Sequence, residues 1–377
     1  MKKMMELLER IEFIEDSRQQ AKVRHRMRDI IIIVLLAVLS GADDWVEIGI
    51  FAKSHEKYLR QYVKLESGVP SHDTIQRVMA LVSPEHMQEL MTAWQEIVNA
   101  GKEEELRKIL SIDGKTMRGN RKNDEKPQHI VSAYCHEYGY CMGQEAVEVK
   151  SNEITAIPKL LDKINVQNCV VTTDAMGTQT AIAEKIKAKG GDYTLALKGN
   201  QSSLHDDVRD YFADEELCNK IKKDGAYKLT RENAHSQVEV REYYQTEDIN
   251  WLPQKKNWKG LKSIGMERKT IERRDGTTTV DYRYFISSIE EDIELFRRSV
   301  RQHWSVEVMH WHLDVTFRED ANHTIDKISA RNLNIVRKFC LSILKMVEVL
   351  MPRLSIKKKR FAIGQDVEHL LDQVLRC

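Results

Sequence analysis

The first 105 residues show a helical pattern, because apolar side chains recur every three to four positions and the only clear break falls at residues 67–71. The longest apolar run covers residues 30–39 and ends at the polar segment 40–44. A helix needs about 20 apolar residues to cross a bilayer, so this run predicts a buried helix rather than a membrane span. We therefore expect an all-α amino-terminal domain over residues 1–105.

A helix start follows the break. Asp73 with Gln76 three residues later matches a capping box, and Ile75, Val78 and Met79 then form an apolar stripe. Two interpretations stay open: an ordinary capped helix, or the second helix of a helix-turn-helix DNA reader. Basic residues ahead of the break favour the second interpretation slightly, namely Lys22, Arg24, Arg26 and Arg28.

From about residue 106 the pattern changes to short segments rich in β-forming residues. Strands are predicted at residues 108–112, 130–136, 140–149, 169–173 and 192–197, and helices at 157–164 and 178–189. Antiparallel strands that lead into βαβ crossovers predict an α/β fold with a mixed sheet and helices on both of its faces.

Residues 225–290 interrupt this alternation with charged β-like segments at 238–244, 262–271 and 278–286, and with an Asp275-Gly276 hairpin signal. We interpret them as a β-rich insertion. From residue 291 the chain is helical again, and the last 25 residues predict an amphipathic tail helix after a basic run. The expected boundaries are 106–215 and 291–350 for the two parts of the core, 216–290 for the insertion and 351–377 for the basic tail.

The net charge of +1 conceals local basic runs. Residues 251–275 hold eight Lys or Arg against three acids, and residues 353–360 hold five bases and no acid. A phosphate backbone would be attracted to such runs, although solvated surface lysines explain either run equally well. Six scattered cysteines without a Cys-x-x-Cys pair, and no signal-like amino-terminal segment, favour a reduced, cytoplasmic protein.

Two aspartates follow predicted strands of the same sheet. Asp113 follows residues 109–112 and Asp174 follows residues 169–173. Ligands of open α/β sheets gather at the carboxyl ends of strands, so the two side chains form a site-like arrangement. A tight Asp-Gly turn at Asp113, or a simple strand-end role for Asp174, is the alternative interpretation.

Glu307 is the third candidate. Reading residues 293–315 as one helix places Glu307 inside a stripe that includes Val300, Trp304 and Trp311, so its carboxylate is predicted to face the core. A buried carboxylate must be protonated, paired or bound to a metal. Arg301 or Arg318 is a possible partner, but metal binding also explains the two aspartates.

Three carboxylates are hard oxygen ligands, which suit two Mg²⁺ ions and phosphoryl chemistry on a polyanion. His303 and His310 flank Glu307 and raise zinc or di-iron ligation as a rival, which would need a second Glu-x-x-His such as Glu232 with His235. Lys115, Arg118 and Lys198 follow strand ends, where they could steady phosphate oxygens.

Four segments carry a resemblance to a known family: Ser-Ile-Asp-Gly-Lys-Thr-Met-Arg-Gly (111–119), Thr-Thr-Asp-Ala-Met-Gly-Thr-Gln (172–179), Leu-Lys-Gly-Asn-Gln (197–201), and the run 301–320 around Glu307. They resemble DDE-type insertion-sequence transposases of the group that includes the H-repeat-associated proteins. Residues 42–48 and 68–75 resemble the associated amino-terminal domain of that group.

The resemblance implies a ribonuclease-H-like core with the insertion before the glutamate helix, and Asp113, Asp174 and Glu307 as catalytic, metal-binding acids. It also implies Mg²⁺ or Mn²⁺ as cofactor, terminal inverted repeats and target DNA as partners, and a homodimer or higher multimer on double-stranded DNA. The expected activity is cleavage at element ends and strand transfer. The alternatives are a silent or domesticated protein that binds or represses the repeat, and a resolvase-like nuclease.

The chain departs from this family at several positions. Val308 follows the glutamate where the group usually has Asn, and residues 235–237 read His-Ser-Gln instead of His-Gly-Arg. More distant relatives place Tyr, Arg and Lys where this helix has Val300, His303 and Asp314, so Arg318, Lys327 or Arg331 could take over DNA contacts. The full set of candidate DNA-binding residues is Lys115, Arg118, Lys198, Arg301, His303, His310 and Arg318.

Overall fold

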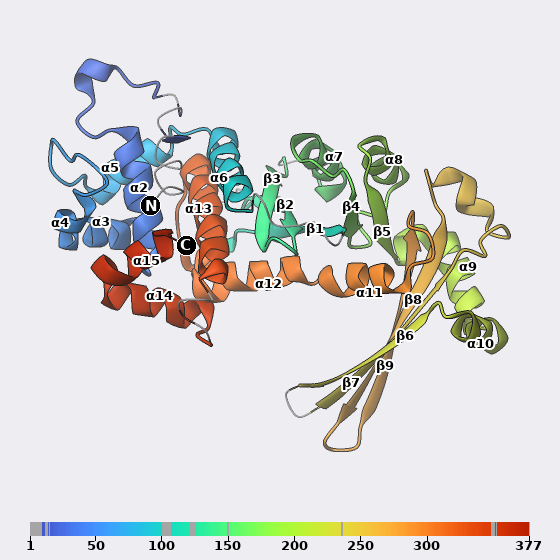
Figure 1. Ribbon diagram of the computed structural model, residues 1–377. Coiled ribbons are helices and arrows are strands. Elements are labelled where there is room, and N and C mark those ends of the chain that lie inside the picture. Colours follow the sequence, from blue (N-terminus) through green and yellow to red (C-terminus); the bar gives the residue numbers. More distant parts are fainter. Residues whose placement is uncertain are drawn as a thin grey trace.

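The computed structural model describes residues 10–11, 14, 16–99, 107–120, 126–148, 151–234, 237–347, 351 and 353–376 (Figure 1). Within these residues one nine-stranded sheet has the order β3-β2-β1-β4-β5-β9-β8-β7-β6. The strands are β1 (Lys108–Thr116), β2 (His129–Cys135), β3 (Tyr140–Ala146), β4 (Cys169–Thr173), β5 (Asp192–Leu197), β6 (Tyr227–Ala234), β7 (Gln237–Thr246), β8 (Ser263–Arg273) and β9 (Thr278–Ser287).

The first five strands form a mixed sheet, as predicted. β1 pairs antiparallel with β2 and parallel with β4, β2 pairs antiparallel with β3, and β4 pairs parallel with β5. The predicted bounds of β4 and β5 are confirmed. The alternative turn at Asp113 is wrong, because Asp113 and Gly114 pair with Ser132 and Val131 and β1 continues to Thr116.

Helices cover both faces of this sheet, which confirms the predicted layering (Figure 1). One face carries an apolar core shared with α7, α8, α9 and α10. On the other face α11 and α12 run end to end beneath the strands (Figure 1). Their bounds are α7 (Glu153–Lys163), α8 (Thr180–Ala188), α9 (Ser202–Ala213), α10 (Glu215–Asp224), α11 (Ile293–Gln302) and α12 (Ser305–Trp311).

The predicted β-rich insertion is not a separate sheet. β9 pairs antiparallel with β5, and β8, β7 and β6 follow in order, so the insertion extends the central sheet. We call strands β6–β9 the arm. The far ends of these strands project away from the body (Figure 1). At its tip Gly276 has φ +82°, which fits the predicted Asp275-Gly276 turn.

A helical body lies at the other side of the sheet and draws on both ends of the chain (Figure 1). The predicted buried run lies within α2, which is almost wholly buried. Helices α2, α5 and α6 share one core with α13, and α14 packs on α2 and α13. Bounds are α2 (Met27–Leu39), α3 (Trp45–Ser54), α4 (Glu56–Leu59), α5 (His72–Met79), α6 (Pro84–Asn99), α13 (Lys327–Met346), α14 (Ile356–Gln365) and α15 (Asp372–Arg376).

Two details of the helical body differ from the sequence predictions. The cap of α5 is Ser71, whose hydroxyl accepts the Thr74 N–H, and Asp73 lies one residue inside the helix. The predicted tail helix is divided into α14, a π-helical turn at Val367–Leu371 and α15. Among the described residues, none of the helices combines the length and the apolar composition that a membrane span requires.

The basic runs are not uniform surfaces. In the run 353–360, Lys359 and Arg360 are buried, and Lys359 donates to the Leu344 carbonyl at 2.9 Å. The run 251–275 is divided between the two ends of β8, and Lys262 and Lys269 pair with Glu290 and Glu239. Part of the positive charge in both runs is therefore engaged within the protein and is not available to phosphates.

Candidate active site

Asp113 projects from β1 toward the sheet face covered by α11 and α12. Its Oδ2 lies 3.5 Å from Nδ1 of His310 on α12. Burial raises the pKa of Asp113, but His310, the Gly114 N–H and His303 together outweigh burial, so the pKa lies below its usual value. Asp113 is therefore held as an anion.

Asp174 follows β4 on the same sheet face. In the parallel pair of β1 and β4, Ile112 lies beside Thr173. Asp113 and Asp174 are the residues that follow these two, so they occupy matching positions on the two strands. Asp174 Oδ1 accepts the Gly177 N–H at 3.1 Å. Burial raises the pKa of Asp174, and the nearby Glu153 and Asp113 carboxylates raise it further, despite the Gly177 hydrogen bond. Two like charges thus lie close together at this edge of the sheet.

Glu307 lies on α12, but the prediction that it faces the core is wrong. The predicted single helix is interrupted at residues 303–304, and in its second part Val306 and Met309 are buried while Trp311 is 54% exposed. Glu307 is exposed on the side of the helix that borders a cavity. Partial burial and the Asp113 carboxylate raise its pKa, and the Arg283 guanidinium offsets part of this rise.

The cavity has a volume of about 140 Å³ and lies between the end of β4 and the junction of α11 with α12. Asp174 and Glu307 both line it, and its charged or aromatic lining also includes Lys198, Arg283, His303 and Trp304. No three His, Cys, Asp or Glu side chains in the described part of the chain are grouped closely enough to hold a metal ion. The predicted three-carboxylate set is therefore not assembled in this conformation.

The zinc and di-iron alternative receives no support from the described residues. Glu232 lies on strand β6 rather than on a helix, and it forms an ion pair with Arg301 Nη2 at 3.3 Å. His235 lies outside the described residues. His303 donates to or accepts from the Thr172 hydroxyl at 3.0 Å, and burial lowers the pKa of His303 to about 4, so its ring is neutral at pH 7.

The candidate DNA-binding residues are placed very differently from one another. Lys198 lines the cavity, and Arg118 is 82% exposed beyond the end of β1. Lys115, in contrast, is enclosed by Asp314, Glu319 and Asp320, with its ammonium 2.7 Å from Asp314 Oδ1. Lys115 therefore serves an internal ion-pair cluster and is not available to a phosphate.

The remaining candidates border the glutamate helix. Arg301 is 40% exposed and is engaged by Glu232 on the arm, while His310 contacts Asp113. Arg318 is exposed and has φ +49°, an unusual conformation for a residue with a side chain. Of the proposed substitutes, Arg331 pairs with Glu85 at 3.1 Å.

Sequence reasoning missed two groups beside the acids. Arg283 on β9 reaches the cavity from the insertion. Glu153, the first residue of α7, lies 2.7 Å from Nε2 of His129, and a Cβ at Gly114 would overlap both side chains. The glycine after Asp113 therefore permits this close approach, and no local signal in the sequence indicates either group.

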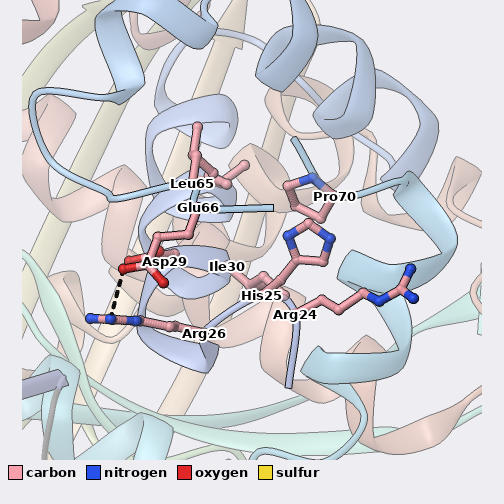
Figure 2. A pocket seen from close by; sticks show the side chains of 9 residues that line it. Arg24, His25, Arg26, Asp29, Ile30, Leu65, Glu66 and Pro70 are labelled. Carbon is pink, nitrogen blue, oxygen red and sulfur yellow. Dashed lines mark hydrogen bonds and ion pairs between the residues drawn. The ribbon is translucent and has the colours of Figure 1, made fainter. Parts of the chain in front are cut away.

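The basic segment ahead of α2 lines a small cleft in the helical body. Figure 2 shows His25 and Arg26 around this cleft, with Arg24 extending away from it. Arg26 Nη2 forms an ion pair with Glu66 Oε1 at 3.0 Å, and both side chains are largely exposed. Exposed pairs of this kind contribute little to stability, so Arg24 and Arg26 stay accessible to a polyanion.

Two family models match the chain. The model described as Transposase DDE domain matches residues 104–343, and the model described as DDE_Tnp_1-associated matches residues 8–95. The chain therefore belongs to the DDE transposase family. Domains of this family generally use divalent metal ions, and their substrates are DNA.

Curated relatives agree with this assignment. The H repeat-associated putative transposase YhhI of Escherichia coli K12 is 34% identical over 96% of each chain. The H repeat-associated putative transposase YbfD of the same strain is 37% identical over 62% of this chain and 91% of its own length. A short relative named Inactive transposase YbfQ is 43% identical over 20% of this chain and 88% of its own length.

Proposed function

We propose that the protein is an active DNA transposase that cleaves phosphodiester bonds at the ends of its element and joins these ends to target DNA. One observation carries the proposal. Asp113 and Asp174 project from neighbouring strands onto the same face of the sheet, and Asp174 shares a cavity with Glu307 on the facing helix. Family membership supports the DNA substrate.

The order of the first five strands supports a ribonuclease-H-like core. Three antiparallel strands, β3-β2-β1, are followed by the parallel strands β4 and β5, and helices cover both faces. In this arrangement the carboxyl ends of β1 and β4 point to the same edge, where ligands of α/β sheets bind. The arm enters the chain between β5 and the helix that bears Glu307.

The donor set fits a hard divalent cation. Asp174 and Glu307 have raised pKa values, in part because each lies near the Asp113 carboxylate, so a cation among them would relieve their mutual repulsion. We infer that Asp113, Asp174 and Glu307 hold Mg²⁺ or Mn²⁺, with two ions in the complex with DNA. When bound, such ions activate the attacking oxygen and offset charge on the leaving oxygen.

The chain's own residues orient this site. His310 contacts the Asp113 carboxylate, and the Gly177 N–H fixes the rotamer of Asp174. His303, at the junction of α11 with α12, is joined to Thr172 of β4 by a hydrogen bond. Lys198, in the cavity wall, supplies positive charge to a phosphate that enters between Asp174 and Glu307.

The test uses purified protein and a labelled duplex that carries the inverted repeats flanking its gene. With Mg²⁺ or Mn²⁺ the wild type should nick the repeat end, and Asp113→Asn, Asp174→Asn and Glu307→Gln should bind the duplex but not nick it. Asp210→Asn, at an exposed α9 position, is the matched control. Binding by the wild type with no metal-dependent nicking would support the alternative of a silent repeat-binding protein.

A further inference from the structure

The arm contributes a guanidinium to the wall of the catalytic cavity. Arg283 lies on β9 and lines the cavity together with Asp174, Glu307 and Lys198. Its side chain is 34% exposed, so a ligand in the cavity can reach it. Positive charge is thus placed beside the acids by an element distant from them in the sequence.

The position of Arg283 is fixed by an aromatic face. Its Cζ lies 4.6 Å from the centre of the Trp304 ring, at the junction of α11 with α12. Stacking of a guanidinium on a tryptophan face is a favourable cation–π contact that restricts the side chain without using its N–H donors. The donors are therefore held in one plane near the cavity.

The acidic neighbours of Arg283 engage it weakly. Its Nε lies 3.5 Å from Asp281 Oδ2, and its Nη1 lies 4.0 Å from Glu267 Oε2. Both distances exceed the roughly 3.2 Å limit of a well-formed N–H···O hydrogen bond. Glu267 is instead engaged by Arg241 at 2.7 Å. Arg283 therefore keeps N–H donors for a further acceptor.

Two other basic groups near the acids are not available to a phosphate. His303, one turn before Glu307, is buried against Thr172 and is neutral at pH 7. Lys115 is enclosed by the carboxylates of Asp314 and Glu319. A guanidinium matches the geometry of two phosphate oxygens better than an ammonium does, because its planar fork can donate two parallel hydrogen bonds.

We propose that Arg283 is a catalytic residue of the insertion, which donates hydrogen bonds to the non-bridging oxygens of the phosphodiester under attack. This inference rests on the proposed function and deepens it, because it assigns the arm a part in the chemistry. Trp304 is the positioning residue that holds the guanidinium in place.

The experiment measures single-turnover nicking of the inverted-repeat duplex with Mn²⁺, and binding of the same duplex with Ca²⁺. Arg283→Ala should nick about 10²-fold more slowly than the wild type, and its Kd should change by no more than about threefold. Arg283→Lys should recover only part of the rate, and added ethylguanidinium should partly restore Arg283→Ala. Arg209→Ala is the control, since Arg209 is a surface arginine in two ion pairs on α9.

Two results would overturn the inference while the wild type still nicks. One is an Arg283→Ala rate equal to that of Arg209→Ala. The other is a slow rate that ethylguanidinium does not restore and that is matched by an equal loss of binding, which would make the arm a DNA clamp. If instead the wild type binds the duplex but does not nick it, the proposed function itself fails and the inference fails with it.

Discussion

Arg360 provides the sharpest test of the helical body, because the sequence predicts a surface residue and the structure buries it. Its guanidinium donates to the carbonyls of Val38 and Ala42, at 3.0 and 3.1 Å, and also to the carbonyl of Thr316. It forms an ion pair with Asp43 at 2.9 Å. One side chain thus joins α14 to the end of α2 and to the π-helical turn at His312–Thr316 that follows the glutamate helix.

The perturbation is Arg360→Met, which keeps an unbranched apolar stem and removes the guanidinium donors. Removing one partner of a buried ion pair costs about 3–5 kcal/mol, because the remaining charge is left uncompensated. Each buried carbonyl that loses its donor costs about 1–3 kcal/mol, and these costs overlap rather than add. We therefore expect a loss of about 3–5 kcal/mol, a large part of the roughly 5–15 kcal/mol that stabilises a folded protein.

Urea unfolding, followed by tryptophan fluorescence and far-UV circular dichroism, measures this loss. Lys357→Met, at an exposed position of the same helix, is the control and should change the free energy of unfolding by less than about 0.5 kcal/mol. A loss below about 1 kcal/mol for Arg360→Met would refute the buried position of Arg360. Such a result would also mean that the run 353–360 is a surface that can contact DNA.

Three further predictions concern the site and the sheet. Asp174→Asn should raise the melting temperature at pH 7, and this difference from the wild type should disappear near pH 3.8. The pKa of Asp174 is raised in the folded state, so the stability of the wild type falls as pH rises through that pKa. Equal melting temperatures of variant and wild type across this range would contradict the prediction. Mn²⁺ at about 100 times its Kd should stabilise the wild type by about 2.7 kcal/mol in thermal unfolding, and chelation should remove the gain; an equal gain in the Asp113→Asn, Asp174→Asn double variant would exclude these carboxylates as ligands. Gly265→Ala should lower the free energy of unfolding by about 1–3 kcal/mol, because the added Cβ would overlap the buried Phe296 ring. Gly199→Ala is the control and should leave the free energy of unfolding unchanged, because a Cβ there meets open space.

Most of the core could be predicted from local patterns. β4 and β5 are short runs of β-forming residues, and α2 is a continuous apolar run. Such segments are stable only in the protein interior, so their burial could be predicted. The position of Asp174 directly after β4 follows from the same patterns, whereas Asp113 lies inside β1 and not at the predicted strand end. Their common sheet face could then be inferred from the expected crossovers.

Other features depend on contacts that no local pattern shows. No glycine or proline marks the interruption at residues 303–304, and Glu307 lies at the edge of the cavity rather than in the predicted core. Lys359 and Arg360 are buried because the two ends of the chain pack together. The approach of Arg283 to Glu307 requires the register of β9 against β5, which is set only by folding.

The pairing of β9 with β5 has a consequence for any attempt to separate the arm from the rest of the molecule. Deleting residues 216–290 would remove β9, the neighbour of β5. The N–H and C=O groups of β5 that now pair with β9 would then lie unpaired at an exposed edge of the sheet. Such an edge invites pairing between molecules, so a shortened protein should precipitate. The arm and the rest of the sheet therefore have to be expressed as one unit.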